Sequence, residues 1–418
     1  MTGMCKAPHL FLTCLLAGVT PGQAQEPPQL SADLDHLLNF AELWTSTRAD
    51  FATRYTAKTD DATAEKPPQF EWMSAEQDRA RFSRKMFRNV ETRLTMFGKS
   101  VKVEEAVVEF VNDRPARVSV SFYNRGDSGA METADFERIF KTVGQSLNQA
   151  LKSAPRSVLN PSAGASKLVS WGWNTPQVVA LLEHNDYSPR ASGGAAGQPE
   201  FLRLKLAAPS QADWTMGRLS TGVGRMGMAA NVRKSADGDV HIANVPMVDQ
   251  GDKGYCVAAT CQRLFEYLRV PCDQHELANL VSVDAQSGVN IFSMQKSLKK
   301  VVGTYRVNFK THINPELYYD NRRQRRVSLQ EFTGIVKEHI GKGVPLLWAL
   351  ELGKYKEDPP LPVSGQTIGG HMRMIIGYNE AKKHIIFSDT WGAGHELKRM
   401  DLPSAWECSI GLYSMTPR

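Results

Sequence analysis

The sequence predicts an α+β protein built from more than one structural unit. The chain has 418 residues, which is too long for one ordinary domain. Its first half alternates β-rich runs with a long amphipathic helix, and its last third places helices before strands. Apolar residues make up 42% and charged residues 22%, as in globular proteins. The net charge of +6 is small, and we expect no nucleic-acid partner.

Residues 1–24 have the pattern of a secretory signal peptide. Lys6 supplies a positive flank, residues 10–19 (LFLTCLLAGV) form a short apolar core, and small residues precede a cleavage site near Ala24. The core is too short to cross a bilayer, and no later apolar run approaches that length. We therefore predict a secreted or periplasmic protein with no integral membrane segment after signal removal.

Residues 25–69 are predicted to be a helical and linker segment, because Leu34, Leu37, Leu38 and Ala41 follow helical spacing. Residues 70–208 are predicted to form an α+β domain of unknown role. Their β-rich runs at 101–111 and 116–122 should pair as a hairpin, followed by an amphipathic helix at 133–151. Further strands are expected at 167–173, 177–183 and 200–206, with a flexible loop at 192–199.

Residues 209–243 are predicted to be a linker carrying a short hairpin turned at Asp237 and Gly238. Residues 244–418 are predicted to form the last unit. Its helices are expected at 256–268, from 273, within 287–302, and at 328–340. Its strands are expected at 345–351, 372–378, 385–388, 396–400 and 409–415. Helices followed by strands favour an α+β arrangement over a doubly wound parallel sheet.

Four cysteines remain after signal removal, and all lie in the last unit: Cys256, Cys261, Cys272 and Cys408. These are too few for a disulfide scaffold. If one thiol is catalytic, the other three can form at most one bridge, whose pairing the sequence leaves open. We interpret Cys261, five residues beyond Cys256 on the same predicted helix, as a core residue, together with the other two unless they pair.

The stretch DQGDKGYCVAAT, residues 249–260, offers a nucleophile. Cys256 lies where a glycine-containing loop becomes a helix, and the exposed N–H groups of a helix start favour a thiolate. The backbone N–H of Cys256 can also point at an oxyanion. Gln250, six residues upstream, has a side-chain amide that can supply a second oxyanion donor.

A base and its orienting group lie further along the chain. His371 follows two glycines and begins the predicted strand HMRMIIGY, and Asp389 ends the next strand. A hairpin between these strands would place the two side chains side by side. A carboxylate that accepts from the imidazole fixes its tautomer and stabilises the imidazolium. Trp391 can then shield that hydrogen bond from water.

These segments resemble those of papain-like cysteine peptidases, in spacing and in the chain order Cys, His, Asn or Asp. Residues 388–392 (SDTWG) are similar to the family's Asn-Ser-Trp-Gly segment. The aspartate in place of asparagine is similar to the bacterial branch that includes leader-cleaving peptidases of bacteriocin exporters. The resemblance runs from Val245 to the end and implies N-terminal helices packed on an antiparallel sheet.

By that resemblance, Cys256 is the nucleophile, His371 the general base and acid, Asp389 the orienting residue and Gln250 an oxyanion donor. We predict an exported cysteine peptidase that hydrolyses peptide or isopeptide bonds in a peptide or protein substrate. A transamidase using the same acyl-enzyme, and an inactive papain-fold scaffold acting by binding, remain alternatives.

We expect no cofactor and no metal, since neither HExxH nor zinc-ligand spacing is present. His275, His384 and His395 are interpreted as surface or structural residues. The basic run at 321–326 (NRRQRR) is interpreted as a solvated loop, and the run at 354–370 as a loop that either borders the cleft or only connects elements.

Overall fold

The computed structural model describes residues 30–56, 68–86, 90–158, 168–189, 197–212, 225–251, 254–270, 272, 274–280, 295, 298–299, 302, 307–315, 327–361 and 366–417. Some sequence-based predictions lie outside the described residues: the signal peptide, most of the loop at 192–199, most of the helix within 287–302, and the basic run at 321–326.

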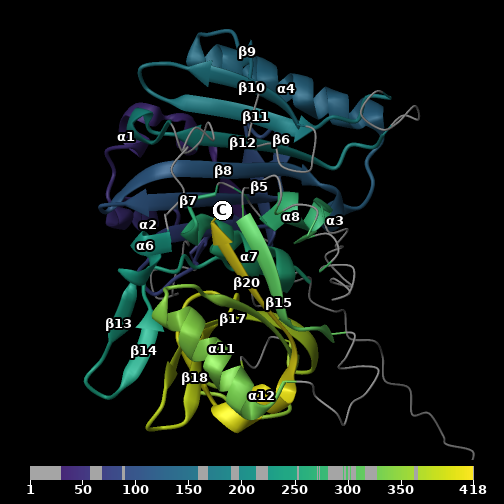
Figure 1. The fold of residues 1–418 in the computed structure, drawn as a ribbon. Coiled ribbons are helices and arrows are strands. Elements are labelled where there is room, and N and C mark those ends of the chain that lie inside the picture. The colour runs from purple at the N-terminus through teal and green to yellow at the C-terminus, as the bar shows by residue number, and fades with distance from the viewer. Residues whose placement is uncertain are drawn as a thin grey trace, which may run out of the picture.

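The architecture is mixed α+β, with two large sheets that are mainly antiparallel (Figure 1). The N-terminal region, residues 30–212, contains an eight-stranded sheet with the order β2-β3-β7-β8-β12-β11-β10-β9. Its strands are β2 Glu71–Trp72, β3 Arg79–Ser83, β7 Glu105–Val111, β8 Arg114–Asn124, β9 Arg156–Ser157, β10 Leu168–Asn174, β11 Val179–Asn185 and β12 Phe201–Ala207.

The predicted hairpin is confirmed, because β7 and β8 pair antiparallel. Asn112 and Asp113 form its turn with φ angles of 50° and 66°, a conformation that Asn and Asp tolerate well. The β-rich run is divided, however. β6 Val101–Val103 leaves the large sheet and pairs with β5 Val90–Met96 in a smaller one, which also holds β4 Lys85–Met86.

The expected helical segment near the N-terminus is only partly helical. β1 Leu30–Asp33 is a strand that pairs in parallel with β5. Short helices follow: η1 Asp35–Leu38, α1 Phe40–Leu43 and α2 Arg48–Arg54. Leu34 and Leu37 are fully buried. Their apolar spacing therefore reflects burial in successive short turns rather than one continuous helix.

The long helix α4 Thr133–Leu151 has the predicted bounds. Phe136, Val143 and Leu147 are its fully buried side chains, and they join the apolar core of the N-terminal region. The remaining short helices of this region are α3 Arg125–Ser128 and η2 Pro209–Gln211.

The second large sheet lies in the C-terminal part, residues 225–417. Its order is β13-β14-β17-β16-β20-β15, with β18 paired to β17 and β19 paired to β18. The strands are β13 Val232–Lys234, β14 Asp239–Ile242, β15 Val307–Ile313, β16 Leu346–Leu352, β17 Gly369–Asn379, β18 His384–Ser388, β19 Lys398–Asp401 and β20 Ser409–Pro417. Sequence reasoning missed β15.

The expected linker at 209–243 is more than a connection. Its hairpin forms, with Gly238 at φ +89°, but β14 then pairs with β17 and extends the C-terminal sheet. Gly377 makes this approach possible, since a Cβ there would lie 2.5 Å from the carbonyl oxygen of Val240. Because Gly377 has no side chain, β14 can pair closely with β17 at this point.

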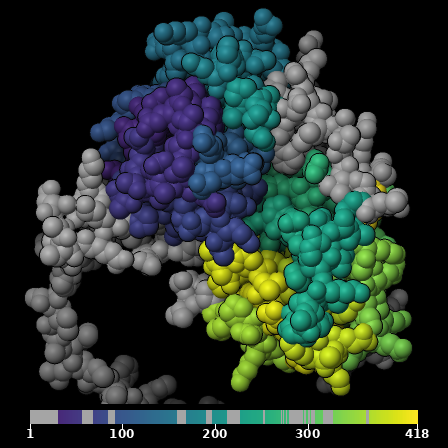
Figure 2. All heavy atoms as spheres, turned by 90° about the vertical axis from the view of Figure 1, so that its left-hand side faces the viewer, coloured from purple at the N-terminus to yellow at the C-terminus, as the bar shows by residue number. Residues whose placement is uncertain are grey.

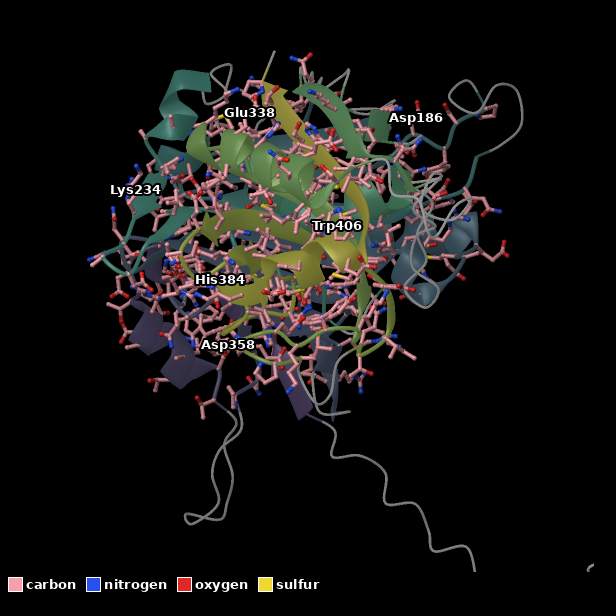
Figure 3. The ribbon with its side chains drawn as sticks, turned by 60° about the horizontal axis from the view of Figure 1, so that its bottom comes forward. Asp186, Lys234, Glu338, Asp358, His384 and Trp406 are labelled. Atoms are coloured by element: carbon pink, nitrogen blue, oxygen red, sulfur yellow. The ribbon has the colours of Figure 1, made fainter. Side chains whose placement is uncertain are left out.

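The helices of the C-terminal part are α6 Arg225–Ala229, α7 Cys256–Tyr267, α8 Gln274–Leu280, α11 Leu329–Gly341 and α12 Leu402–Cys408. Ser328 and Glu331 form a capping box at the start of α11. α11, which carries Glu338, and α12, which carries Trp406, lie over the C-terminal sheet (Figure 3). Within the described part of the chain, we find no helix with the length and apolar character needed to cross a membrane.

The two parts of the molecule meet along a broad contact (Figure 2). Each has its own apolar core, and α7 and α8 lie between the two sheets (Figure 1). A small apolar cluster joins the two parts: Met73 and Val107 of the N-terminal region pack with Val248 and Ala259. Ala259 is three residues beyond Cys256, so the N-terminal region contacts the helix that carries this thiol.

Candidate active site

Cys256 is the first residue of α7 and is partly exposed. The preceding residue, Tyr255, is the N-cap but makes no side-chain capping bond to the helix. The first backbone N–H groups of α7 are therefore not capped by the side chain of Tyr255. Their partial positive charge favours an anion at the start of the helix, where the thiol of Cys256 lies. α7 packs against β17, and Thr260 donates from Oγ1 to the carbonyl oxygen of Met372 at 3.2 Å.

The structure brings His371 and Asp389 together. His371 lies near the start of β17, and Asp389 directly follows β18, the antiparallel neighbour of that strand. Nε2 of His371 lies 2.7 Å from Oδ1 of Asp389, and both side chains are fully buried. The same carboxylate oxygen accepts the backbone N–H of Thr390 at 2.9 Å. The carboxylate is therefore fixed from two sides.

The other ring nitrogen of His371 is the one available to the thiol. Nδ1 is buried, and no group among the described residues meets both the distance and the angle of a hydrogen bond to it. Because Asp389 holds Nε2, a proton shared with Cys256 must pass through Nδ1. Trp391 stacks on the imidazole with ring centroids 4.6 Å apart and planes at 20°. The indole thus covers the His371–Asp389 pair.

A chain of buried charges extends behind Asp389. Nε of Arg373 lies 2.7 Å from Oδ2 of Asp389, close enough for an ion pair although the angle is not that of a hydrogen bond. The guanidinium also bonds both carboxylate oxygens of Glu357, at 2.6 and 3.0 Å. Glu357 in turn pairs with Lys398, whose side chain is fully buried. Two residues apart on β17, Arg373 and His371 project to the same side of the strand.

These neighbours set the protonation of the pair. Burial alone would lower the pKa of His371, but Asp389 and then Cys256 raise it to about 9. Burial alone would raise the pKa of the Cys256 thiol, but the neighbouring His371 brings it below its ordinary value. The pKa of Asp389 lies well below its usual range, because Arg373 and His371 outweigh burial. A thiolate beside an imidazolium is the arrangement that these directions favour near neutral pH.

Gln250 is buried beside the same segment. Its backbone N–H donates to the carbonyl oxygen of Thr390 at 2.8 Å, and its side-chain oxygen accepts from Oγ1 of Thr390 at 2.6 Å. Thr390 thereby fixes which end of the amide is the acceptor. The opposite end is the NH₂ group, the donor that an oxyanion requires.

Arg263 links the three segments of the site. It is buried on α7 and donates to the carbonyl oxygens of Pro246, at 2.6 Å, and Asp389, at 2.7 Å, and to Oγ of Ser388, at 2.5 Å. Burial lowers its pKa to about 10, which still leaves it charged at neutral pH. One side chain thus joins the cysteine helix to the loop before Gln250 and to the strand end that carries Asp389.

The other three cysteines are not among these residues, whereas His395 borders the site: its carbonyl oxygen accepts the N–H of Asp389 at 2.9 Å, and its ring meets Trp391 edge-on with centroids 5.9 Å apart. Cys261, Cys272 and Cys408 are buried thiols, and burial raises the pKa of Cys261 to about 12. His384 lies 3.2 Å from a carboxylate oxygen of Asp239 at the far end of β18. Among the residues that the structure describes, no group of three or more His, Cys, Asp and Glu side chains is placed to hold a metal ion.

Sequence reasoning missed Arg373, Arg263, Thr390 and Glu357. Arg373 had a detectable signal, because an arginine inside an otherwise apolar strand, HMRMIIGY, needs a buried partner. Glu357 had none, since it lies in the run 354–370 that was interpreted as a loop. Part of that run is fixed to strand β19, because Asp358 exchanges backbone hydrogen bonds with Arg399 at 2.9 and 2.7 Å.

Comparisons with known proteins agree with the resemblance that the sequence predicted. Residues 242–410 match the family described as "Peptidase_C39 like family". The similarity of this segment to the papain-like cysteine peptidase superfamily is therefore confirmed. No curated protein matches the chain.

Two solved structures are among the matches. One is the peptidase domain of Streptococcus ComA, a bi-functional ABC transporter involved in a quorum sensing pathway, at 12% identity and a TM-score of 0.26. That match covers 42% of this chain and 100% of the other. The second is xylellain, a cysteine protease from Xylella fastidiosa, at 12% identity and a TM-score of 0.25, covering 46% and 88% of the two chains.

Proposed function

We propose that the chain is a cysteine peptidase that hydrolyses peptide or isopeptide bonds, with Cys256 as nucleophile and His371 as general base and acid. The observation that carries this proposal is the 2.7 Å contact between His371 and Asp389, next to a helix-start thiol whose pKa His371 lowers. A structural cysteine buried among apolar groups has a raised pKa, as Cys261 does in the same helix.

The reaction follows from the positions of these groups. The thiolate of Cys256 attacks the carbonyl carbon, and the carbonyl electrons move onto oxygen. Gln250 and the backbone N–H of Cys256 donate to that oxyanion. Imidazolium His371 then gives its Nδ1 proton to the leaving amine, and Asp389 stabilises the charged ring until that transfer. Water, deprotonated by His371, finally releases the acyl group.

The first test is alkylation of the reduced full chain with iodoacetamide at about pH 5.5, read by peptide mass mapping. An ordinary thiol of pKa about 8.5 is protonated there in all but about one molecule in a thousand. We expect fast modification confined to Cys256, and its loss by a factor of roughly a thousand in His371→Ala. His184→Ala, at a buried histidine of the N-terminal region, is the matched control and should leave the rate unchanged.

Fluorescently labelled casein, with mass analysis of the products, then identifies the reaction. New carboxyl termini indicate hydrolysis, whereas an amide formed with added amine indicates a transamidase. Slow, uniform labelling of Cys256 and Cys261 would contradict an ion pair and would leave the papain-like segment as a scaffold that acts by binding.

We also propose that the protein is exported, with cleavage near Ala24, on the strength of the signal-like pattern at its N-terminus. We further propose that the domain expected over residues 70–208 is distinct from the peptidase unit and also includes residues 30–56, because Leu34, Phe40 and Phe51 belong to its apolar core and the C-terminal part has a core of its own. N-terminal sequencing of the mature protein tests the first proposal. Limited proteolysis at the junction, residues 213–224, tests the second.

A further inference from the structure

We propose that the N-terminal region is a working part of the catalytic unit and that Arg81 is a positioning residue for the oxyanion donor Gln250. This inference rests on the proposed peptidase function. It assigns a role to a region that shows no catalytic motif of its own. The geometry that supports it lies where strand β3 meets the loop that leads into α7.

The side chain of Arg81 contacts the loop that leads into α7, directly beside Gln250. This side chain is 1% exposed, and Nη2 lies 3.3 Å from Oδ2 of Asp249, the residue before Gln250. It also contacts the residue after Gln250, because a Cβ built on Gly251 would lie 2.5 Å from Nη1 of Arg81. A side chain at this position would displace the end of Arg81, and Gly251 also has a φ of +67°, which favours glycine. One guanidinium from the N-terminal region thus touches both chain neighbours of Gln250.

The loop is fixed on its other side by the peptidase segment. Thr390 holds the backbone and side chain of Gln250, and the other carboxylate oxygen of Asp249 accepts the N–H of Gly251 at 2.8 Å. Glu71, also in the N-terminal region, lies 3.0 Å from Nη2 of Arg81 and holds it in place. The loop around Gln250 is therefore held in position by Arg81 on one side and by the segment that follows β18 on the other.

A second arginine on β3 strengthens the same contact. Arg79 lies two residues before Arg81 and so projects to the same side of the strand. It donates to the carbonyl oxygen of Met247 at 3.1 Å and pairs with Glu266, on the last turn of α7, at 2.6 Å. Asn124 donates to the hydroxyl of Tyr255 at 3.4 Å, which holds the residue before Cys256 as well.

These contacts make the N-terminal region a support rather than a removable cover. A region that only blocks a cleft needs to contact the exposed side of the site. Here buried ion pairs reach Asp249, beside the oxyanion donor, and the last turn of the nucleophile helix, and a hydrogen bond from Asn124 reaches the residue before its start. Taking the region away would remove the cations that pair with Asp249 and Glu266 and would uncover the apolar side chains of Val248 and Ala259.

The test separates two reactions of the same thiol on the full chain. Acylation by p-nitrophenyl acetate forms an S–C bond at a carbonyl, passes through an oxyanion and expels p-nitrophenolate. Alkylation by iodoacetamide forms an S–C bond at a CH₂ group and expels iodide, with no oxyanion. Loss of Gln250 positioning therefore slows the first reaction and leaves the second unchanged, whereas loss of the fold slows both.

We expect Arg81→Met to slow acylation of Cys256 by about tenfold to a hundredfold, the range for a misplaced oxyanion donor, with alkylation unchanged. Arg81→Lys keeps the charge and should recover part of the acylation rate. Gln250→Ala should show the same split, and the double variant should be no slower than Gln250→Ala alone. Arg203→Met is the matched control, since Arg203 is a buried arginine that pairs with Glu183 within the N-terminal sheet.

Two results would overturn the inference: equal loss of both reactions in Arg81→Met and Arg81→Lys, or acylation that neither variant slows. Arg81→Lys, the milder change, decides the matter if Arg81→Met does not fold. A wild-type chain that iodoacetamide labels at Cys256 but p-nitrophenyl acetate does not would overturn the proposed peptidase function. That failure is recognised before any Arg81 variant is compared.

Discussion

Each half of the molecule holds a buried carboxylate between two basic side chains. In the N-terminal sheet, Glu183 lies 2.8 Å from Nε of Arg203 and 3.0 Å from Nζ of Lys205. In the C-terminal part, Asp389 lies between Arg373 and His371, each at 2.7 Å. Both carboxylates are fully buried, and the basic neighbours of each lower its pKa.

The two clusters differ in one of the two basic side chains that surround the carboxylate. The partners of Glu183 are an arginine and a lysine, side-chain types that ordinarily stay cationic at neutral pH and are poorly suited to exchanging a proton there. His371, whose pKa is raised to about 9, can give up and regain a proton, and its other ring nitrogen faces a thiol. Replacing one permanent cation by a histidine turns a stabilising ion cluster into one that can pass a proton. We therefore expect changes around Glu183 to alter stability and changes around Asp389 to alter the reactivity of Cys256.

The largest expected effect is on stability, from Glu183→Gln. Removing one partner of a buried ion cluster typically costs about 3–5 kcal/mol of the free energy of unfolding. Arg203 and Lys205 lower the folded pKa of Glu183 to about 2 against the effect of burial. The wild type should therefore lose stability as pH falls from about 4.5 toward 2, and the variant should lose less over that window.

Urea unfolding at a series of pH values measures this change. Alkylation of Cys256 by iodoacetamide should be the same in Glu183→Gln as in the wild type. A fall in that alkylation rate, with the protein still folded, would remove the distinction between the two clusters.

The next effect is on reactivity, from Asp389→Asn. The amide can still accept from His371 but carries no charge, so the pKa of the imidazole should fall from about 9 toward its ordinary value near 6.5. We expect casein hydrolysis by the wild type to decline as pH rises through about 9, when His371 no longer protonates the leaving amine. In Asp389→Asn that decline should occur about two pH units lower.

The pH–rate profile of hydrolysis measures both limits. Ser170→Ala serves as a control of the same kind in the other cluster, because Ser170 donates to Glu183 at 3.2 Å. An unshifted upper limit in Asp389→Asn would mean that Asp389 does not set the protonation of His371.

Much of the fold could be predicted from the sequence because local patterns decide it. The hairpin of β7 and β8 and the helix α4 follow from alternation and amphipathic spacing. The parallel pairing of β1 and the docking of β14 depend on partners distant in the chain, which no local pattern specifies. The helix start at Cys256 was predictable for a local reason, the change from a glycine-containing loop to a run of helix formers.

The site, like the fold, has one part that local sequence predicts and another that depends on residues distant in the chain. The nearness of His371 and Asp389 follows from a predictable hairpin between two adjacent strands. The charges behind them do not, since Glu357 and Lys398 come from a loop and from another strand. Arg81 lies about 170 positions before Gln250 (250 − 81 = 169), and sequence reasoning assigned no role to the N-terminal region.

A smaller effect is expected from Arg373→Met, which removes the cation that keeps Asp389 ionised. The pKa of Asp389 should rise toward its ordinary value, so that Asp389 becomes protonated at a higher pH as the solution is acidified. His371 then loses its carboxylate, and the acid limit of Cys256 alkylation should move up by about one pH unit, a tenfold change in rate near that limit. Arg373→Lys should restore part of the shift, and Arg203→Met should cause none.

The smallest effect is expected one step further out, from Lys398→Met. Glu357 and Arg373 lie between Lys398 and Asp389, and Arg373 keeps its two bonds to Glu357 when Lys398 is lost. The acid limit of alkylation should therefore move by less than about 0.3 pH units, a twofold change in rate. A shift as large as that of Arg373→Met would mean that the four side chains act as one unit, and that the contrast with the Glu183 cluster depends on the whole network rather than on the histidine.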